Sequence, residues 1–143
     1  MSIRVFHRDN PSLFIPLISK DARFVVWPGI GAWNANMNYV RLEPGEANVP
    51  HIHAESEDTI FILEGEGTIH DHTNKISLPF HAGCAVHVPV GVKHAVAADK
   101  GVRVVSVGGP APADVRLLKA VGALKQNAFA PSSASTSFSQ HVI

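Results

Sequence analysis

Three histidines and two neighbouring acidic residues form the sequence feature with the clearest chemistry. His51 and His53 stand two residues apart, and the segment that follows them ends in Glu57 and Asp58. In an extended strand, residues two apart project from the same face, so the two imidazoles would lie together. A third histidine, His94, lies further along the chain after a Pro-x-Gly turn. Three imidazoles and one carboxylate that converge from different strands would form a four-ligand site for a divalent transition metal.

The acidic ligand has two candidates, Asp58 and Glu57. If Asp58 faces inward, strand alternation also brings Ile60 and Ile62 to the interior, whereas an inward Glu57 would bring Thr59 there. This pattern favours Asp58 as the ligand, with Glu57 as the alternative. Because the aspartate arm is one methylene shorter than a glutamate arm, the metal would be held more weakly or in effect by the three histidines.

Two side chains are weaker candidates for a catalytic role. Glu57 could act as a general base beside a metal held by Asp58, although a solvated charge at the rim of the site is the ordinary interpretation. His87 lies in a predicted strand, and its parity is opposite to that of Val86 and Val88. His87 therefore faces either the second sheet or an interface, and the first of these would bring it near a substrate cavity.

The segments that would position these side chains are short strands. Runs of β-branched and aromatic residues alternate with turns rich in Gly, Pro, Asn and Asp, which indicates an all-β sandwich or barrel. One C-terminal segment differs, because Val115, Leu118, Val121 and Leu124 recur at helical spacing after a candidate cap at Asp114. We predict strands at Arg23–Trp27, Met37–Leu42, Thr59–Leu63, Thr68–His70, Ala85–Val88, Ala95–Ala97 and Val102–Val107.

The chain of 143 residues has the size of one domain. We divide it into an N-terminal arm at 1–22, a barrel at 23–110, an amphipathic helix at 111–126 and a Ser-rich tail at 127–143. The apolar part of the arm, Leu13–Ile18, could cover an exposed sheet edge of a second subunit. We therefore expect a homodimer.

The composition limits the classes of partner. Twelve basic and twelve acidic residues cancel, so no concentrated positive charge points to nucleic acid or an acidic membrane. The N-terminal segment is a poor match to a signal peptide, and no apolar run reaches the length of a membrane span. We expect a cytoplasmic protein with a small-molecule partner, no nucleic acid and no membrane.

Two linked patterns in the sequence resemble the motifs of the cupin superfamily. The first motif, G-x5-H-x-H-x3,4-E-x6-G, is matched by Gly45, His51, His53 and Gly65, and counting back six residues from Gly65 again leads to Asp58. The second, G-x5-P-x-G-x2-H-x3-N, is matched by Gly83, Pro89, Gly91 and His94, with Ala98 in place of the final asparagine. The resemblance implies a small double-stranded β-helix, or jelly-roll, barrel with a metal at these ligands.

The resemblance allows two kinds of metal chemistry. With Fe(II), an organic ligand and dioxygen can bind side by side, which gives dioxygenase activity. With Zn, Ni, Mn or Fe as a Lewis acid, the site would support isomerase, lyase or decarboxylase chemistry. We favour Fe(II) and the oxidation of a small organic metabolite. The alternative is a cupin that binds a small molecule without catalysis.

Overall fold

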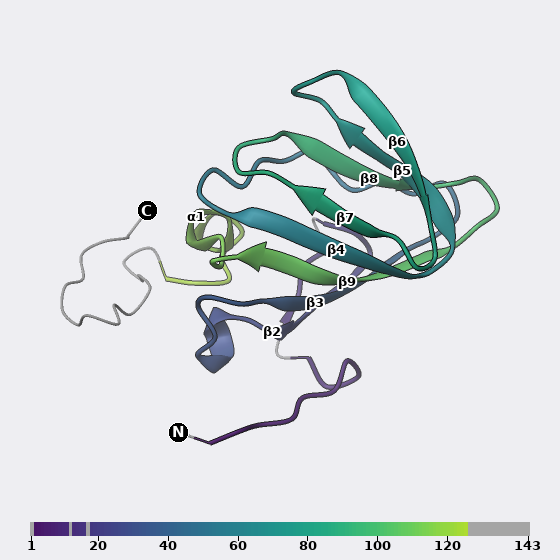
Figure 1. Ribbon diagram of the computed structural model, residues 1–143. Helices are drawn as coiled ribbons and strands as arrows, with labels where there is room; N and C mark the ends of the chain where they lie inside the picture. The colour runs from purple at the N-terminus through teal and green to yellow at the C-terminus, as the bar shows by residue number, and fades with distance from the viewer. Residues whose placement is uncertain (1, 12, 17, 126–143) are drawn as a thin grey trace.

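The computed structural model describes residues 2–11, 13–16 and 18–125, so the predicted tail at 127–143 lies outside the described residues. Two antiparallel sheets face each other, with strand orders β1-β2-β3-β9-β4-β7 and β6-β5-β8 (Figure 1). The predicted all-β fold with one C-terminal helix is confirmed. The strands and the helices, in chain order, are β1 (Leu13–Phe14), β2 (Asp21–Val26), the 3-10 helix η1 (Pro28–Ile30), β3 (Met37–Leu42), β4 (Glu57–Glu64), β5 (Glu66–Asp71), β6 (Ile76–His81), β7 (Ala85–Val88), β8 (His94–Ala98), β9 (Val104–Ala111) and α1 (Val115–Ala120).

The inward-facing residues of three strands change from apolar at one end of the barrel to polar at the other. Alternation along a strand places every second side chain on the same face. The apolar ends form the main core, in which Leu42, Ile62 and Val104 are fully buried. The polar ends therefore meet at the opposite end of the barrel. The inward series are Asn38, Val40 and Leu42 in β3, Asp58, Ile60 and Ile62 in β4, and His94, Val96 and Ala98 in β8.

Helix α1 and the N-terminal segment pack together beside the polar end. Leu118 of the helix, Phe24 of β2 and Ile15 after β1 belong to a second buried cluster. The side chain of Asp114 accepts a hydrogen bond from the backbone N–H of Leu117, which confirms the predicted helix cap. Strand β1 pairs with β2 of the same chain. Pairing of the arm with a second subunit remains a prediction, as does the cytoplasmic location.

Strands β6 and β9 differ from their predictions. No strand is predicted at the position of β6. Its interior residue Pro79 cannot donate to a ladder, but β6 lies at the edge of its sheet, where proline is tolerated. Strand β9 continues through Gly108 and Gly109 to Ala111, beyond the predicted end at Val107. Within residues 2–11, 13–16 and 18–125, no helix has the length and apolar character needed to cross a membrane.

Gly108 is the glycine on which the long β9 strand depends. Its φ angle is +134°, and a Cβ atom there would meet the carbonyl oxygen of Thr59 on β4. We expect Gly108→Ala to lower the free energy of unfolding by about 3–5 kcal/mol, since backbone strain and overpacking add. Urea unfolding measures this change.

Gly83 supplies the matched control for this prediction. Its φ angle is +96°, but no atom of the described residues lies within 4 Å of the position that its Cβ would take. Gly83→Ala therefore carries only the strain of the left-handed backbone, about 1–2 kcal/mol. If Gly108→Ala and Gly83→Ala lowered the free energy of unfolding equally, the approach of β9 to β4 at Gly108 would not be close.

Candidate metal centre

Four side chains meet between the two sheets at the polar end of the barrel. One ligand atom from each of His51, His53, Asp58 and His94 can be chosen so that all four lie within 4.8 Å of one another. The imidazole centroids of His51 and His94 are 4.4 Å apart, and those of His53 and His94 are 5.5 Å apart. This spacing places three imidazoles and one carboxylate around a common point, as the sequence patterns predict.

The backbone fixes the histidines through pairs of hydrogen bonds. His51 and His94 form an isolated antiparallel bridge, in which each backbone N–H donates to the carbonyl of the other at 3.0 Å. His53 accepts a backbone hydrogen bond from Gly91, so the Pro-x-Gly turn is tied to the first histidine pair. The His51–His53 segment is thus extended, although it lies in the connection between β3 and β4 and not in a strand of either sheet.

Each histidine uses Nδ1 for a hydrogen bond with the protein. The Nδ1–H groups of His51 and His94 donate to the carbonyl oxygens of Val49 and Val92 at 2.8 and 2.9 Å. Because an imidazole that donates through Nδ1 presents Nε2 as its lone-pair atom when neutral, this pattern orients Nε2 for metal binding. The third histidine, His53, follows the same pattern with a carboxylate as acceptor.

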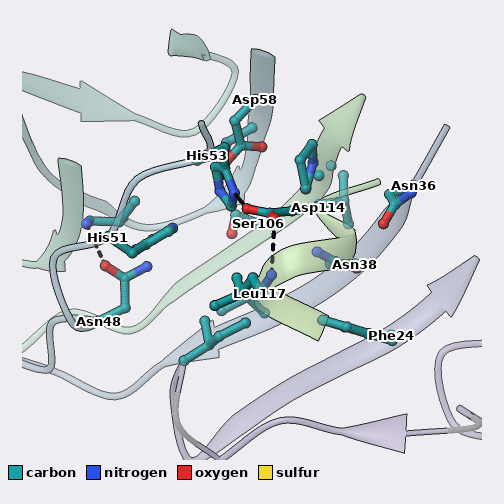
Figure 2. A pocket seen from close by; sticks show the side chains of 18 of the residues that line it. Phe24, Asn36, Asn38, Asn48, His51, His53, Asp58, Ser106, Asp114 and Leu117 are labelled. Atoms are coloured by element: carbon teal, nitrogen blue, oxygen red, sulfur yellow. Dashed lines mark hydrogen bonds and ion pairs between the residues drawn. The ribbon is translucent and has the colours of Figure 1, made fainter. Parts of the chain in front are cut away.

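Asp114 is the residue that the sequence analysis did not connect to the site. Its Oδ2 accepts a hydrogen bond of 2.7 Å from Nδ1 of His53, while its Oδ1 accepts from the backbone of Leu117. The helix cap and the orientation of His53 therefore depend on the same carboxylate (Figure 2). Carboxylate–histidine–metal triads use this arrangement to set the tautomer and basicity of the ligand.

Two buried atoms of the cluster have no hydrogen-bond partner among the described residues. These are Nε2 of His94, which lies 3.6 Å from Oδ2 of Asp58, and Oδ1 of Asp58, in side chains that are only 1% and 6% exposed. An unpaired buried polar atom costs free energy, so native structures seldom leave one without a function. A metal ion bound by these two atoms would satisfy both. The donor set therefore fits a divalent transition metal.

Burial and neighbouring charges shift the pKa values of three members of the cluster in different directions. Burial opposes charge on Asp58, but its interactions with His53 and His94 hold the pKa of its carboxyl well below the usual range. Burial likewise opposes charge on His53, but hydrogen bonds and charges from Asp114 and Asp58 raise its pKa to about 9. Burial lowers the pKa of His51. Two carboxylates thus surround His53, and they attract either a proton or a metal cation.

Comparisons with known proteins agree with this fold. Residues 38–108 match the family described as Cupin domain. An uncharacterized conserved protein with a double-stranded β-helix domain from Klebsiella pneumoniae superposes with a TM-score of 0.60 at 21% identity, over 78% of this chain and 91% of that one. The chain belongs to the cupin superfamily.

The curated relatives of this cupin are longer proteins. Germin-like protein 3-5 from Oryza sativa subsp. japonica is 31% identical over 74 residues, which are 48% of this chain and 33% of that protein. Oxalate oxidase GF-3.8 from Triticum aestivum is 29% identical over 80 residues, which are 52% of this chain and 36% of that protein. The chain thus spans about a third of the length of the curated relatives it matches.

Glu57 and His87 of this cupin lie away from the cluster. Nε2 of His87 and Oε1 of Glu57 are 2.7 Å apart, and the two side chains are 57% and 62% exposed. Strand β7 pairs with β4 so that His87 lies opposite Thr59, on the outward face. The structure thus places Asp58, and not Glu57, beside the three histidines.

A cavity of about 80 Å³ opens beside the four clustered side chains. It lies between the inner faces of β3 and β9 and helix α1, and Figure 2 shows side chains that line it. A small molecule in this cavity would lie next to the cluster. Besides the cluster, its wall includes Phe24, Asn36, Asn38, Ser106, Leu117 and Leu118.

Proposed function

We propose that this cupin binds a divalent transition metal through His51, His53, Asp58 and His94 and uses it to oxidise a small organic metabolite with dioxygen. The observation that carries the proposal is the convergence of four ligand atoms within 4.8 Å, together with the unpaired buried atoms of His94 and Asp58. Fe(II) is the favoured metal, because a site of histidines and one carboxylate with open positions suits iron-dependent oxygen chemistry.

The residues of the chain have distinct tasks in this proposal. When bound, Fe(II) would provide open positions at which dioxygen and the organic substrate meet, and the substrate would supply the electrons that reduce dioxygen. His51 and His94 are held by backbone carbonyls with Nε2 directed inward. Asp114 holds His53, and its charge makes that imidazole more basic. Asp58 balances the charge of the cation, and the cavity wall positions the substrate.

The similarity to oxalate oxidase GF-3.8 supports oxidative chemistry, since that relative is named for the oxidation of oxalate. The similarity covers about half of this chain. The substrate of this protein therefore has to be inferred from its own cavity.

Metal analysis together with dioxygen uptake tests the proposal. We expect purified protein to hold close to one equivalent of iron after anaerobic loading with Fe(II), and to consume dioxygen when a panel of small organic acids, diketones and phenols is added. The His51→Ala/His94→Ala double variant is expected to lose both the metal and the uptake.

Other outcomes of that measurement would overturn the proposal in different ways. Preferential binding of Zn, Ni or Mn, with turnover but without dioxygen uptake, would indicate Lewis-acid chemistry of the isomerase, lyase or decarboxylase type. Stabilisation by a ligand without any turnover would indicate a binding protein. No binding of any of the four metals would remove the metal centre itself.

A further inference from the structure

We propose that the cavity takes an uncharged, largely apolar metabolite, and that Asn36 and Asn38 recognise a hydrogen-bonding group at the end of it distant from the metal. This inference rests on the proposed function, because the cluster of His51, His53, Asp58 and His94 is taken to bind the other end. It specifies a class of substrate for that site.

The two asparagines interrupt an apolar pattern. Asn36, Asn38, Val40 and Leu42 stand at every second position, and all four line the same cavity. Nδ2 of Asn36 and Oδ1 of Asn38 are buried and have no hydrogen-bond partner in the part of the chain that the structure describes. Leaving such a donor and acceptor unpaired costs roughly 1–3 kcal/mol each. A bound molecule with a complementary acceptor and donor would remove that cost.

The neighbouring strand leaves room for these amides. Gly109 on β9 has no side chain, and a Cβ there would lie 2.9 Å from Cβ of Asn36 and 3.2 Å from Nδ2 of Asn38. Figure 2 shows Asn36 and Asn38 on one side of Asp114 and His51 and His53 on the other. A ligand that spans the cavity would therefore meet the metal at one end and the two amides at the other.

The charges around the cavity favour an uncharged molecule. Among the described residues that line it, none is lysine or arginine, while Asp58 and Asp114 are both carboxylates. A divalent metal balances these two negative charges, so no positive charge remains for a carboxylate at the distant end of the ligand. A carboxylate buried there would lose its hydration without gaining a cationic partner, whereas uncharged amide, hydroxyl or carbonyl groups avoid that cost of desolvation.

The middle of the ligand would contact apolar side chains. Phe24, Leu117 and Leu118 line the cavity and also line an adjoining apolar cavity that reaches Ile15 and Val121. Apolar walls with a few oriented polar groups are typical of sites for small organic molecules. The substrate is therefore expected to carry an aromatic or aliphatic body between its two polar ends.

Two catechols that differ in one group test this inference. Protocatechuamide carries a carboxamide where protocatechuate carries a carboxylate, and both have the same metal-binding hydroxyls. Calorimetry with the Zn(II)-loaded full chain measures binding without oxygen chemistry. We expect the amide to bind at least about tenfold more tightly than the carboxylate, a difference of about 1.4 kcal/mol.

Variants of the asparagines show whether these residues cause the preference. We expect Asn36→Ala and Asn38→Ala each to weaken binding of the amide roughly three- to tenfold, the range for one lost hydrogen bond, and to leave metal content unchanged. Asn34→Ala is the matched control, because Asn34 is exposed and does not line this cavity. Metal content and thermal unfolding, measured on every sample, confirm that each variant is folded.

The outcomes separate this inference from the proposed function. Equal binding of the two catechols, tighter binding of the carboxylate, or a preference that survives both alanine variants would overturn the inference while the metal centre stands. Loss of metal from the wild-type protein would overturn the proposed function and the inference together. The comparison in wild-type protein decides the question even where a variant does not fold.

Discussion

Asp58→Asn is expected to lower the affinity for divalent metal by at least about 100-fold, more than the roughly 10–100-fold that follows loss of an outer-shell partner. The carboxylate is buried, lies 3.4 Å from Nε2 of His53 and 3.6 Å from Nε2 of His94, and has one oxygen without a partner. Asparagine keeps the size of the side chain but removes the negative charge that balances the cation. Titration of the metal against a chromophoric chelator measures the change.

Glu57→Gln is the matched control for this prediction, because it removes the neighbouring carboxylate from the outer face. We expect it to leave the metal affinity unchanged, since Glu57 contacts His87 in solvent. A larger loss from Glu57→Gln than from Asp58→Asn would contradict the assignment of the acidic ligand. Full affinity in Asp58→Asn would show that three histidines hold the metal alone.

The convergence of the four clustered side chains could be predicted because it follows from local rules. The x in His51-x-His53 is enough to put both imidazoles on one face of an extended segment. Alternation in β4 then places Asp58 and Ile62 inward, and both are buried, while Phe61 is exposed. Short-range spacing and the apolar pattern of a single strand were thus enough to predict most of the cluster.

The role of Asp114 could not be predicted in the same way. Its helix cap is a local signal, and the sequence shows it, but its contact with His53 joins residues 61 positions apart. Such a contact depends on where helix α1 packs against the barrel. No periodicity in the sequence specifies that position.

Asn38 of β3 shows a second limit. The alternation that predicts β3 also places Asn38 on the inward face, but it does not say what lies opposite. In the structure, Asn38 pairs with Gly108 of β9, and Gly109 provides the space beside it. The same glycines led the sequence analysis to end β9 early, because glycine usually weakens a strand. Here the glycines allow the close approach of a neighbouring strand and of polar side chains.

Asp114→Asn is expected to lower the metal affinity roughly 10–100-fold without removing the helix cap. Asparagine caps helices about as well as aspartate, so its oxygen can still accept from the N–H of Leu117. Its amide N–H₂ group then faces Nδ1 of His53. Because that group is a hydrogen-bond donor, it disfavours a proton on Nδ1. The neutral imidazole would place its proton on Nε2 instead, the atom that the metal requires.

Asp114→Ala separates the two tasks of this carboxylate. Both variants are expected to lose metal affinity, but only alanine removes the cap, so its free energy of unfolding should be lower than that of Asp114→Asn by about 1 kcal/mol. Nitrogen NMR of the metal-free proteins reports directly which nitrogens of His53 carry a proton. Unchanged metal affinity in Asp114→Asn, with Nδ1 still protonated, would show that packing alone orients His53. A loss confined to Asp114→Ala would assign the carboxylate to the helix and not to the metal centre.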